Sequence, residues 1–473
     1  MAGASYNFNF KPFVIEPFKK TKFLSSKYLK FIKDFNLNPV PKTIAVNSRI
    51  NRNFSSQKSR NLIEGLSPQP ELKQRNFVFD WDYTIGFDLT KSLQLNFNAT
   101  NSFIYDSFGR DEDLEIYDKF FNIGRPNSYH QKLNGTYKIP INKIPYLGFL
   151  SADYAYTADF DWQAASQSPI FNDVGELVGN VRDKVGNMIQ NANTHNINAT
   201  VDFGRFYKTL KLDKLLVKKG KKGPVKKGSL KLGADQKTDG KLKLKKNASF
   251  GQKALKGLYD VLTSVKRAKI SYSQNNGTLL QGYIPSVGFL GRNNFGGGLA
   301  PTFGFVFGSQ TDILRNAIDN GWLVTRDPND PNDTYYNKNY GKNSNKKLDY
   351  TVSVKPFKSL TIDLRGNRIQ TSRLTQQLDV IKTGVNANGE DIFEQNSTIK
   401  AFETGDFSIS HFMLSTMFTD GETLYQNFRD YRSTIANRLY DETGFTRPTN
   451  PDDPAFKENG QQAMLPAFLA AYS

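Results

Sequence analysis

The sequence predicts an all-β protein in which antiparallel transmembrane β-barrel strands are joined by long loops that carry short helices. Two observations lead to this fold class. Apolar and polar residues alternate over three long stretches. Along the chain, short turns and long loops connect successive strands alternately. A third observation excludes a helical membrane anchor, because the longest apolar stretch, 463–472, has about ten residues and a spanning helix needs about 20.

The alternation is clearest over residues 77–89, 93–105 and 150–162. In these runs 20 of 21 in-phase positions are apolar, against 3 of the 18 positions between them. A period of two indicates a β-strand, because successive side chains point to opposite faces. The in-phase residues expected to face lipid are Phe77, Phe79, Trp81, Tyr83, Ile85, Phe87, Leu89, Leu93, Leu95, Phe97, Tyr154, Tyr156, Phe160 and Trp162. The alternate residues expected to face a water-filled lumen are Asp80, Asp82, Asp88, Gln94, Asn96, Asn98, Asp153 and Asp159.

The length of these runs favours a membrane barrel over a soluble β-sandwich. Thirteen residues extend about 43 Å, and at a tilt of about 40° such a strand crosses about 33 Å, enough for a hydrocarbon core. Strands of soluble proteins have about 5–6 residues. A soluble sandwich or β-helix stays open as the alternative, since its strands also have one polar face.

The rest of the chain follows the same plan of strands, short turns and long loops. Short turns are expected at Thr90–Ser92, Pro140–Gly148 and Pro356–Ser359. Helices are expected at Thr311–Asn320 and at about 422–442, from the spacing of their apolar residues. Strands are expected near 43–54, 77–89, 93–105, 129–139, 149–163, 188–203, 267–275, 347–355, 360–371 and 401–417. The chain therefore divides into a loop and partial strand region (1–42), barrel strands with loops (43–203), a lysine-rich periplasmic insertion (204–266), barrel strands with the long loop 276–346 (267–417) and a helical loop region (418–473).

The formal charge of +18 comes mostly from one segment. Residues 208–256 hold 17 Lys, no Arg and three Asp, a net +14 that leaves about +4 for the remainder. Proteins that bind nucleic acids usually combine such a basic patch with arginines that make bidentate contacts and with aromatic side chains that stack on bases. This segment has no Arg and few aromatic residues. We therefore expect a solvated arm that could contact anionic lipid or a partner protein, and we do not expect nucleic acid to be that partner.

Composition argues against an enzyme. The absence of cysteine excludes disulfides, thiolate metal sites and cysteine nucleophiles, and the three histidines, at 130, 195 and 411, are far apart. Asp80, Asp82 and Asp88 share one strand face, which a polar lumen explains without catalysis. The Gly296–Gly298 run lacks the following Lys-Ser/Thr of a phosphate loop. No cofactor or metal is expected.

Several segments resemble the SprA (Sov) family, the outer-membrane translocon of the Bacteroidota type IX secretion and gliding machinery. The segments are TKFLSSKYLK (21–30), FNLNP (35–39), SRINR (48–52), YTIGFDLTKSLQL (83–95), GNMIQN (186–191), SYSQNNGTLLQGY (271–283), LTIDLRGN (360–367) and LPAFLAAY (465–472). They are spread over most of the chain, and their order and spacing carry the resemblance.

The resemblance implies a very large single-chain barrel in the outer membrane, whose pore passes folded cargo proteins to the cell surface. It also implies three kinds of partner: outer-membrane lipid, secreted cargo proteins, and a PorV-like barrel together with a periplasmic plug protein. About ten strands are visible in the sequence, so the chain is expected to be an internal fragment of such a barrel. Two alternatives stay open, a smaller outer-membrane channel for solutes or lipids and a soluble β-rich adhesion or binding protein. A third alternative is a β scaffold whose basic arm binds nucleic acid.

Overall fold

A computed structural model describes most of the chain. The described residues are 1–22, 26, 28–59, 71–106, 116–171, 174–210, 257, 259–261, 263–292, 300–328, 338–357, 359–386, 388–389, 391–396, 398–410, 416–443 and 457–472. Most of the lysine-rich insertion, from 211 to 256, and the Gly296–Gly298 run therefore lie outside the described residues. By internal packing the chain forms two units, residues 1–365 with 369–407, and residues 366–368 with 408–473.

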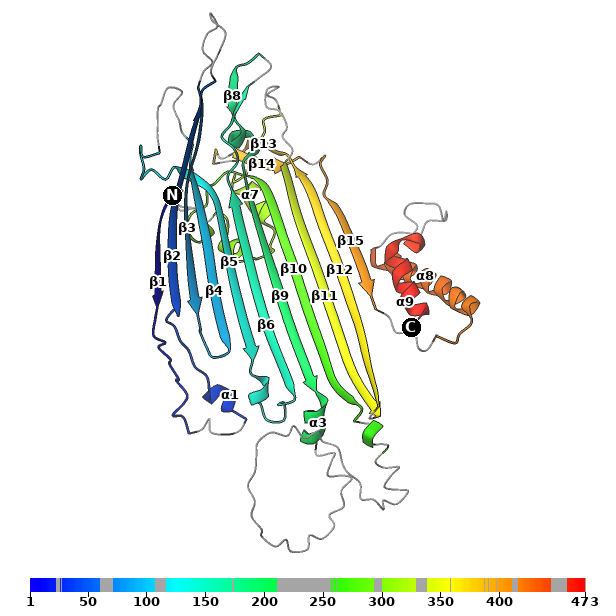
Figure 1. Ribbon diagram of the computed structural model, residues 1–473. Helices are drawn as coiled ribbons and strands as arrows, with labels where there is room; N and C mark the ends of the chain where they lie inside the picture. Colours follow the sequence, from blue (N-terminus) through cyan, green and yellow to red (C-terminus); the bar gives the residue numbers. More distant parts are fainter. Residues whose placement is uncertain are drawn as a thin grey trace, which may run out of the picture. The chain divides into compact units, whose positions relative to one another are not determined.

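The first unit is built on one sheet of eleven strands, most of them joined to the next strand in sequence (Figure 1). In spatial order the strands are β1 (Ala2–Asn9), β2 (Thr43–Gln57), β3 (Leu72–Phe87), β4 (Leu93–Tyr105), β5 (Arg125–Ile139), β6 (Leu150–Gln163), β9 (Asn187–Asp202), β10 (Val265–Tyr283), β11 (Lys338–Phe357), β12 (Leu360–Leu378) and β15 (Phe402–Ile409). Two further hairpins stand apart, β7 (Pro169–Phe171) with β8 (Leu177–Asn180), and β13 (Val380–Val385) with β14 (Asp391–Gln395).

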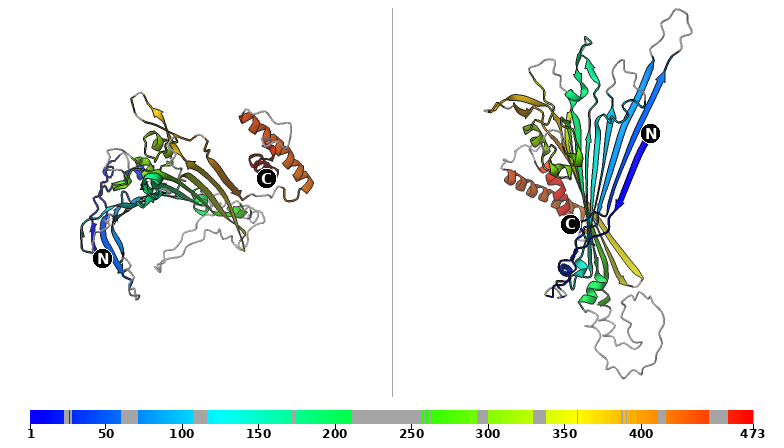
Figure 2. Two further views of the ribbon diagram at one scale, coloured as in Figure 1. Left: turned by 90° about the horizontal axis from the view of Figure 1, so that it is seen from above. Right: turned by 90° about the vertical axis from the view of Figure 1, so that its left-hand side faces the viewer.

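This arrangement confirms the all-β prediction. Each neighbouring pair from β1 to β11 is antiparallel. Within the described residues the sheet is open, with β1 and β15 as its outer strands. Figure 2 shows the sheet from two further sides, and its strands are strongly twisted.

None of the described helices is both long enough and apolar enough to cross a membrane.

The β3–β4 hairpin shows how the alternating pattern becomes a two-faced sheet. At its turn the hydroxyl of Thr90 accepts hydrogen bonds from the amides of Ser92 (3.1 Å) and Leu93 (2.8 Å), which fixes the register. Tyr83 then lies opposite Ala99, so the in-phase residues of both strands share one face. We call the face that carries Tyr83 the apolar face and the opposite face the polar face.

Two strands are longer than their sequence pattern predicts. β10 continues to Tyr283 rather than ending near residue 275, and β11 begins at Lys338 rather than near residue 347. Ladder pairing between them runs from Val265–Val354 to Leu280–Tyr340. The predicted loop 276–346 is therefore shorter than expected, since its two ends continue the sheet.

The loop between β10 and β11 carries short helices, as predicted. They are η3 (Phe289–Gly291), α6 (Phe303–Val306) and α7 (Ile313–Asp319), the last within the predicted helix 311–320. The side chain of Asp312 accepts a hydrogen bond from the amide of Leu314 and so caps α7. Both α6 and α7 lie on one face of the sheet (Figure 2).

The second unit is helical. It contains α8 (Gly421–Thr443), η4 (Lys457–Asn459) and α9 (Gln461–Ala471), so the helix predicted at about 422–442 is confirmed. Ala436, Tyr440 and Ala463 form its small buried core. The predicted strand 401–417 is shorter, because β15 ends at Ile409 and residues 411–415 lie outside the described part.

Candidate functional site

On the polar face of the sheet, side chains of neighbouring strands form hydrogen bonds with one another. On β2 and β3, Asn47 Nδ2 donates to Asp82 Oδ2 at 2.7 Å, and Ser5 Oγ of β1 donates to the Asn47 side-chain oxygen. Near the turn, Asp88 accepts from Gln94 Nε2 at 3.1 Å and pairs with Lys42 at 3.1 Å. These polar side chains therefore form hydrogen bonds and an ion pair with one another along one surface of the sheet.

The same surface continues over β5, β6 and β9. His130 Nδ1 lies 2.5 Å from Asp161 Oδ1, and Lys132 Nζ lies 3.2 Å from Asp159 Oδ1. Farther along, Asn198 Nδ2 donates to Asp153 Oδ2 at 3.0 Å. Acidic groups here are balanced by adjacent cations and amides, so the face is polar without a strong local charge.

All eight residues predicted to face a lumen lie on this polar face and are exposed or half-buried. These eight side chains therefore share the face opposite to the in-phase residues. Whether water in a lumen covers the polar face stays a prediction.

The apolar face is partly covered by the chain itself. We call residues 284–292 and 300–326 the covering segment, which leaves the sheet after β10 and packs back against it. Phe305 meets the ring of Phe160 edge to face with centroids 6.0 Å apart, and Phe289 stacks on Tyr83 at 5.5 Å. Trp162 donates its indole N–H to the carbonyl of Pro285 at 3.2 Å.

Some residues expected to face lipid are therefore buried against protein. Tyr83, Phe97, Phe160 and Trp162 belong to the main core with the covering segment, and Phe77 forms a smaller core with Tyr105. The other nine predicted lipid-facing residues lie half-buried on the same face or at its turns. Four of these five side chains differ from the expectation because the loop after β10 folds back onto the sheet. Phe77 instead lies beside Arg52 and Phe120.

The covering segment is also held by buried side-chain amides that donate to its backbone. Asn191 Nδ2 donates to the carbonyls of Phe305 and Ser309, both at 2.8 Å. Gln131 donates to Val306 at 2.9 Å and Asn193 to Gly308 at 2.6 Å. These carbonyls belong to an irregular segment, so each would be left unpaired in the core without a donor from the sheet.

The amides Gln131, Asn191 and Asn193 are the residues that sequence reasoning missed. Each occupies an in-phase position where the alternation calls for an apolar residue. That interruption is the signal that could have shown a covered face, because lipid offers no acceptor for an amide.

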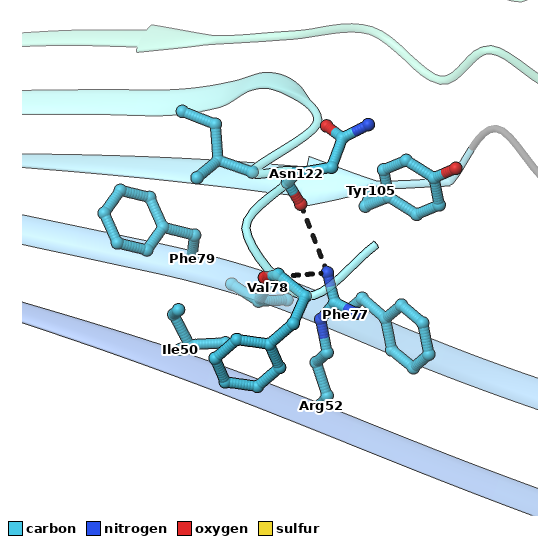
Figure 3. Close-up of a pocket in the computed structure, with 9 residues that line it drawn as sticks. Ile50, Arg52, Phe77, Val78, Phe79, Tyr105 and Asn122 are labelled. Atoms are coloured by element: carbon cyan, nitrogen blue, oxygen red, sulfur yellow. Dashed lines mark hydrogen bonds between the residues drawn. The ribbon is translucent and has the colours of Figure 1, made fainter. Parts of the chain in front are cut away.

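Arg52 fills a small hollow beside β2 and β3 (Figure 3). The hollow holds only about 10 Å³ and is lined by Phe77, Tyr105 and Phe120, among others. The guanidinium occupies its centre and donates to backbone carbonyls of residues 116–122. This hollow is too small for a ligand. The guanidinium of Arg52 inside it holds the loop 116–122 in place.

Another hollow, of about 310 Å³, is lined on one side by residues of 182–187 and on the other by Tyr283, Ile284, Val324 and Thr325. The hydroxyl of Tyr283, which lines it, is buried and has no hydrogen-bond partner among the described residues. No group of three His, Asp or Glu side chains that could hold a metal ion occurs within the described part of the chain.

Comparison with known proteins does not assign the chain. No protein-family model matches it, and no curated protein matches it either.

Proposed function

We propose that this chain forms part of a protein-conducting β-barrel in the bacterial outer membrane, which exports folded cargo proteins in type IX secretion and gliding. The observation that carries the proposal is the sheet of eleven strands with one apolar and one polar face. The longest strands, β10 to β12, have 19 or 20 residues, far beyond the 5–6 of soluble sheets. The resemblance of the sequence segments to the SprA family supports the proposal that the transported cargo consists of folded proteins.

In this proposal the barrel acts as a passive conduit. The apolar face meets lipid where no protein covers it, and the Asp, Asn, Gln and Thr side chains of the polar face line a wet passage. The edges β1 and β15 pair with further strands, since an unpaired edge in lipid leaves backbone groups unsatisfied. Outer-membrane lipid, cargo proteins, a PorV-like barrel and a periplasmic plug protein are the proposed partners.

The test is deletion of the gene that encodes this chain from its bacterium. We expect cargo proteins to accumulate in the periplasm, gliding to stop, and the protein to fractionate with the outer membrane in the wild type. Complementation with the intact gene is the control and should restore both phenotypes.

Two results would overturn the proposal. Unchanged secretion with lost uptake of small solutes would favour the smaller channel. A chain that stays monodisperse in buffer without detergent would favour a soluble β-rich binding protein.

A further inference from the structure

The apolar face of β9 to β12 is divided between protein cover and open surface. Toward the turns it carries the turn-side patch, whose members are apolar residues on neighbouring strands. The patch consists of Ile197, Ala199, Val201, Ala268, Ile270, Tyr272, Leu348, Tyr350, Val352, Val354, Leu360, Ile362 and Leu364. Ladder register places Ile270 between Ala199 and Tyr350, so the patch is continuous across strands.

Six of the thirteen patch residues are exposed and the other seven are half-buried. Ile197 is 41%, Ile270 47% and Ile362 40% accessible, and the covering segment does not extend over them. An exposed apolar surface that spans four strands marks contact with an apolar partner.

A polar row ends the patch on the side away from the turns. His195 lies opposite Gln274, and Gln274 lies opposite Lys346, all on the apolar face. The next row is also polar and bonded within itself, since Asn276 donates to Asn193 and Ser344 donates to Asn276, each at 2.7 Å. The covering segment begins at this second row, where Asn193 donates to Gly308.

Tyrosines bridge the patch and the polar row. The Tyr154 hydroxyl lies 2.8 Å from His195 Nδ1, and the Tyr272 hydroxyl donates to Gln274 Oε1 at 2.8 Å. Each ring therefore lies at the apolar surface while its hydroxyl reaches the polar row. Tyrosines take this orientation at a membrane–water interface.

Aromatic residues also gather at the turn ends. Phe149 packs on Phe206 with ring centroids 4.8 Å apart, and Phe203 packs on Phe206 at 6.1 Å. From Leu348 to the end of β11 at Phe357 a strand extends about 30 Å, or about 23 Å across a membrane at a tilt of about 40°. That height is close to the apolar band of about 25 Å between the two aromatic girdles of outer-membrane barrels.

The outer surface of α7, within the covering segment, differs in character. On α7, Arg315 and Asp319 form an i,i+4 pair whose side chains are 85% and 62% accessible. Its apolar residues Ile313, Leu314 and Ala317 are buried against the core instead. A helix that turns charges outward and apolar residues inward is suited to water.

We propose that acyl chains of the bilayer contact β9 to β12 only at the turn-side patch, that the membrane surface follows the row of His195, Gln274 and Lys346, and that the covering segment lies in water beside it. This inference rests on the proposed function, because it takes the sheet to be a membrane wall. It adds which part of the wall meets lipid.

The absence of cysteine allows a direct test with single-cysteine variants of the full chain in isolated outer membranes. The spin-labelled sites are Ile197→Cys and Ile362→Cys in the patch, Arg315→Cys and Asp319→Cys on α7, and Asn275→Cys on the polar face. Collision of each label with oxygen, which concentrates in lipid, is compared with collision with a water-soluble nickel chelate. Retained cargo secretion identifies the variants that fold.

We expect the oxygen-to-nickel ratio to be several-fold higher at both patch sites than at the other three. A high ratio at the α7 sites as well would overturn the inference and leave the proposed function standing. A low ratio at every site would overturn the proposed function itself. If one patch variant fails to fold, Leu364→Cys on β12 provides the same comparison.

Discussion

Arg52 shows how a single residue fixes a loop on this sheet. Its side chain is buried, yet both terminal nitrogens are satisfied by carbonyls of residues 116–122, at distances from 2.6 to 3.3 Å. Its guanidinium also lies 4.6 Å from the centre of the Phe77 ring. A planar cation with many donors can serve several carbonyls at once, whereas an ammonium group is a point charge with three donors.

We therefore predict that Arg52→Lys loosens the loop although it keeps the charge. Lysine cannot replace the fork of hydrogen bonds, so the local opening free energy of residues 116–122 should fall by about 2 to 3 kcal/mol. Amide hydrogen exchange in that loop measures the change. Arg49→Lys is the matched control, on the same strand but exposed, and should leave exchange unaltered. Equal protection in the two variants would show that charge alone holds the loop.

Residues of the apolar face also show where sequence reasoning reaches its limit. Phe160 and Phe79 both occupy in-phase positions, and nothing in the alternation separates the ring that packs on Phe305 from one that lies nearer solvent. Lipid and protein core both accept an apolar side chain, so the pattern predicts the face but not what covers it. The amides at 191 and 193 carry that missing information.

Among the elements, β10 and β11 illustrate the same limit for strand boundaries. The predicted ends near 275 and 347 fall where in-phase positions change from apolar to polar, as at Asn276 and Ser344. The strands continue because backbone pairing does not depend on side-chain polarity, and the polar side chains bond to each other or to the covering segment. By contrast, the turn at 90–92 was predictable because apolar alternation runs up to both of its sides, and the turn at 140–148 was predictable because it contains prolines.

The far end of the covering segment is tied to the β12–β13 junction. Arg326 donates to both carboxylate oxygens of the buried Asp379, at 2.9 and 2.7 Å, and its amide donates to the carbonyl of Val380 at 2.8 Å. The hydrogen bond from Arg326 is the main cause that holds the pKa of the Asp379 carboxyl below its ordinary value. Asn396 donates to the same carboxylate.

This pair predicts a loss of local stability in acid. A lowered pKa means that the folded state favours the ionised carboxyl, so the stabilisation is complete above the unfolded pKa of about 4 and is lost as pH falls through the lower folded value. Exchange protection of residues 322–326, corrected for intrinsic rates, should drop between pH 5 and the acid limit in the wild type. Asp379→Asn should show weaker protection at neutral pH and little further loss in acid.

Asp391→Asn is the matched control for this prediction. Asp391 pairs with Lys382 at 2.7 Å, but both side chains are about half exposed, and such pairs contribute little. An equal pH response in the two variants would mean that the tie between Arg326 and Asp379 does not hold the segment.

At the scale of the whole sheet, 38% hydrophobic residues suffice for an apolar face because they are placed on alternate positions. The consequence is that the cost of a charge depends on the face that receives it. Ile270 and Asn275 lie on the same strand, both exposed, but on opposite faces. Arginine on the lipid side of a barrel costs about 2 to 4 kcal/mol near the bilayer centre, while a wet lumen accepts it.

We predict that Ile270→Arg strongly lowers the fraction of protein assembled in the outer membrane, whereas Asn275→Arg leaves it close to wild type. Heat-modifiable migration and protease resistance of the membrane fraction measure assembly in both variants. Ile270→Leu controls for loss of the isoleucine itself and should assemble normally, since its apolar volume is conserved. Equal assembly of the two arginine variants would refute the membrane-wall interpretation, because a soluble sheet with two solvated faces has no reason to separate them.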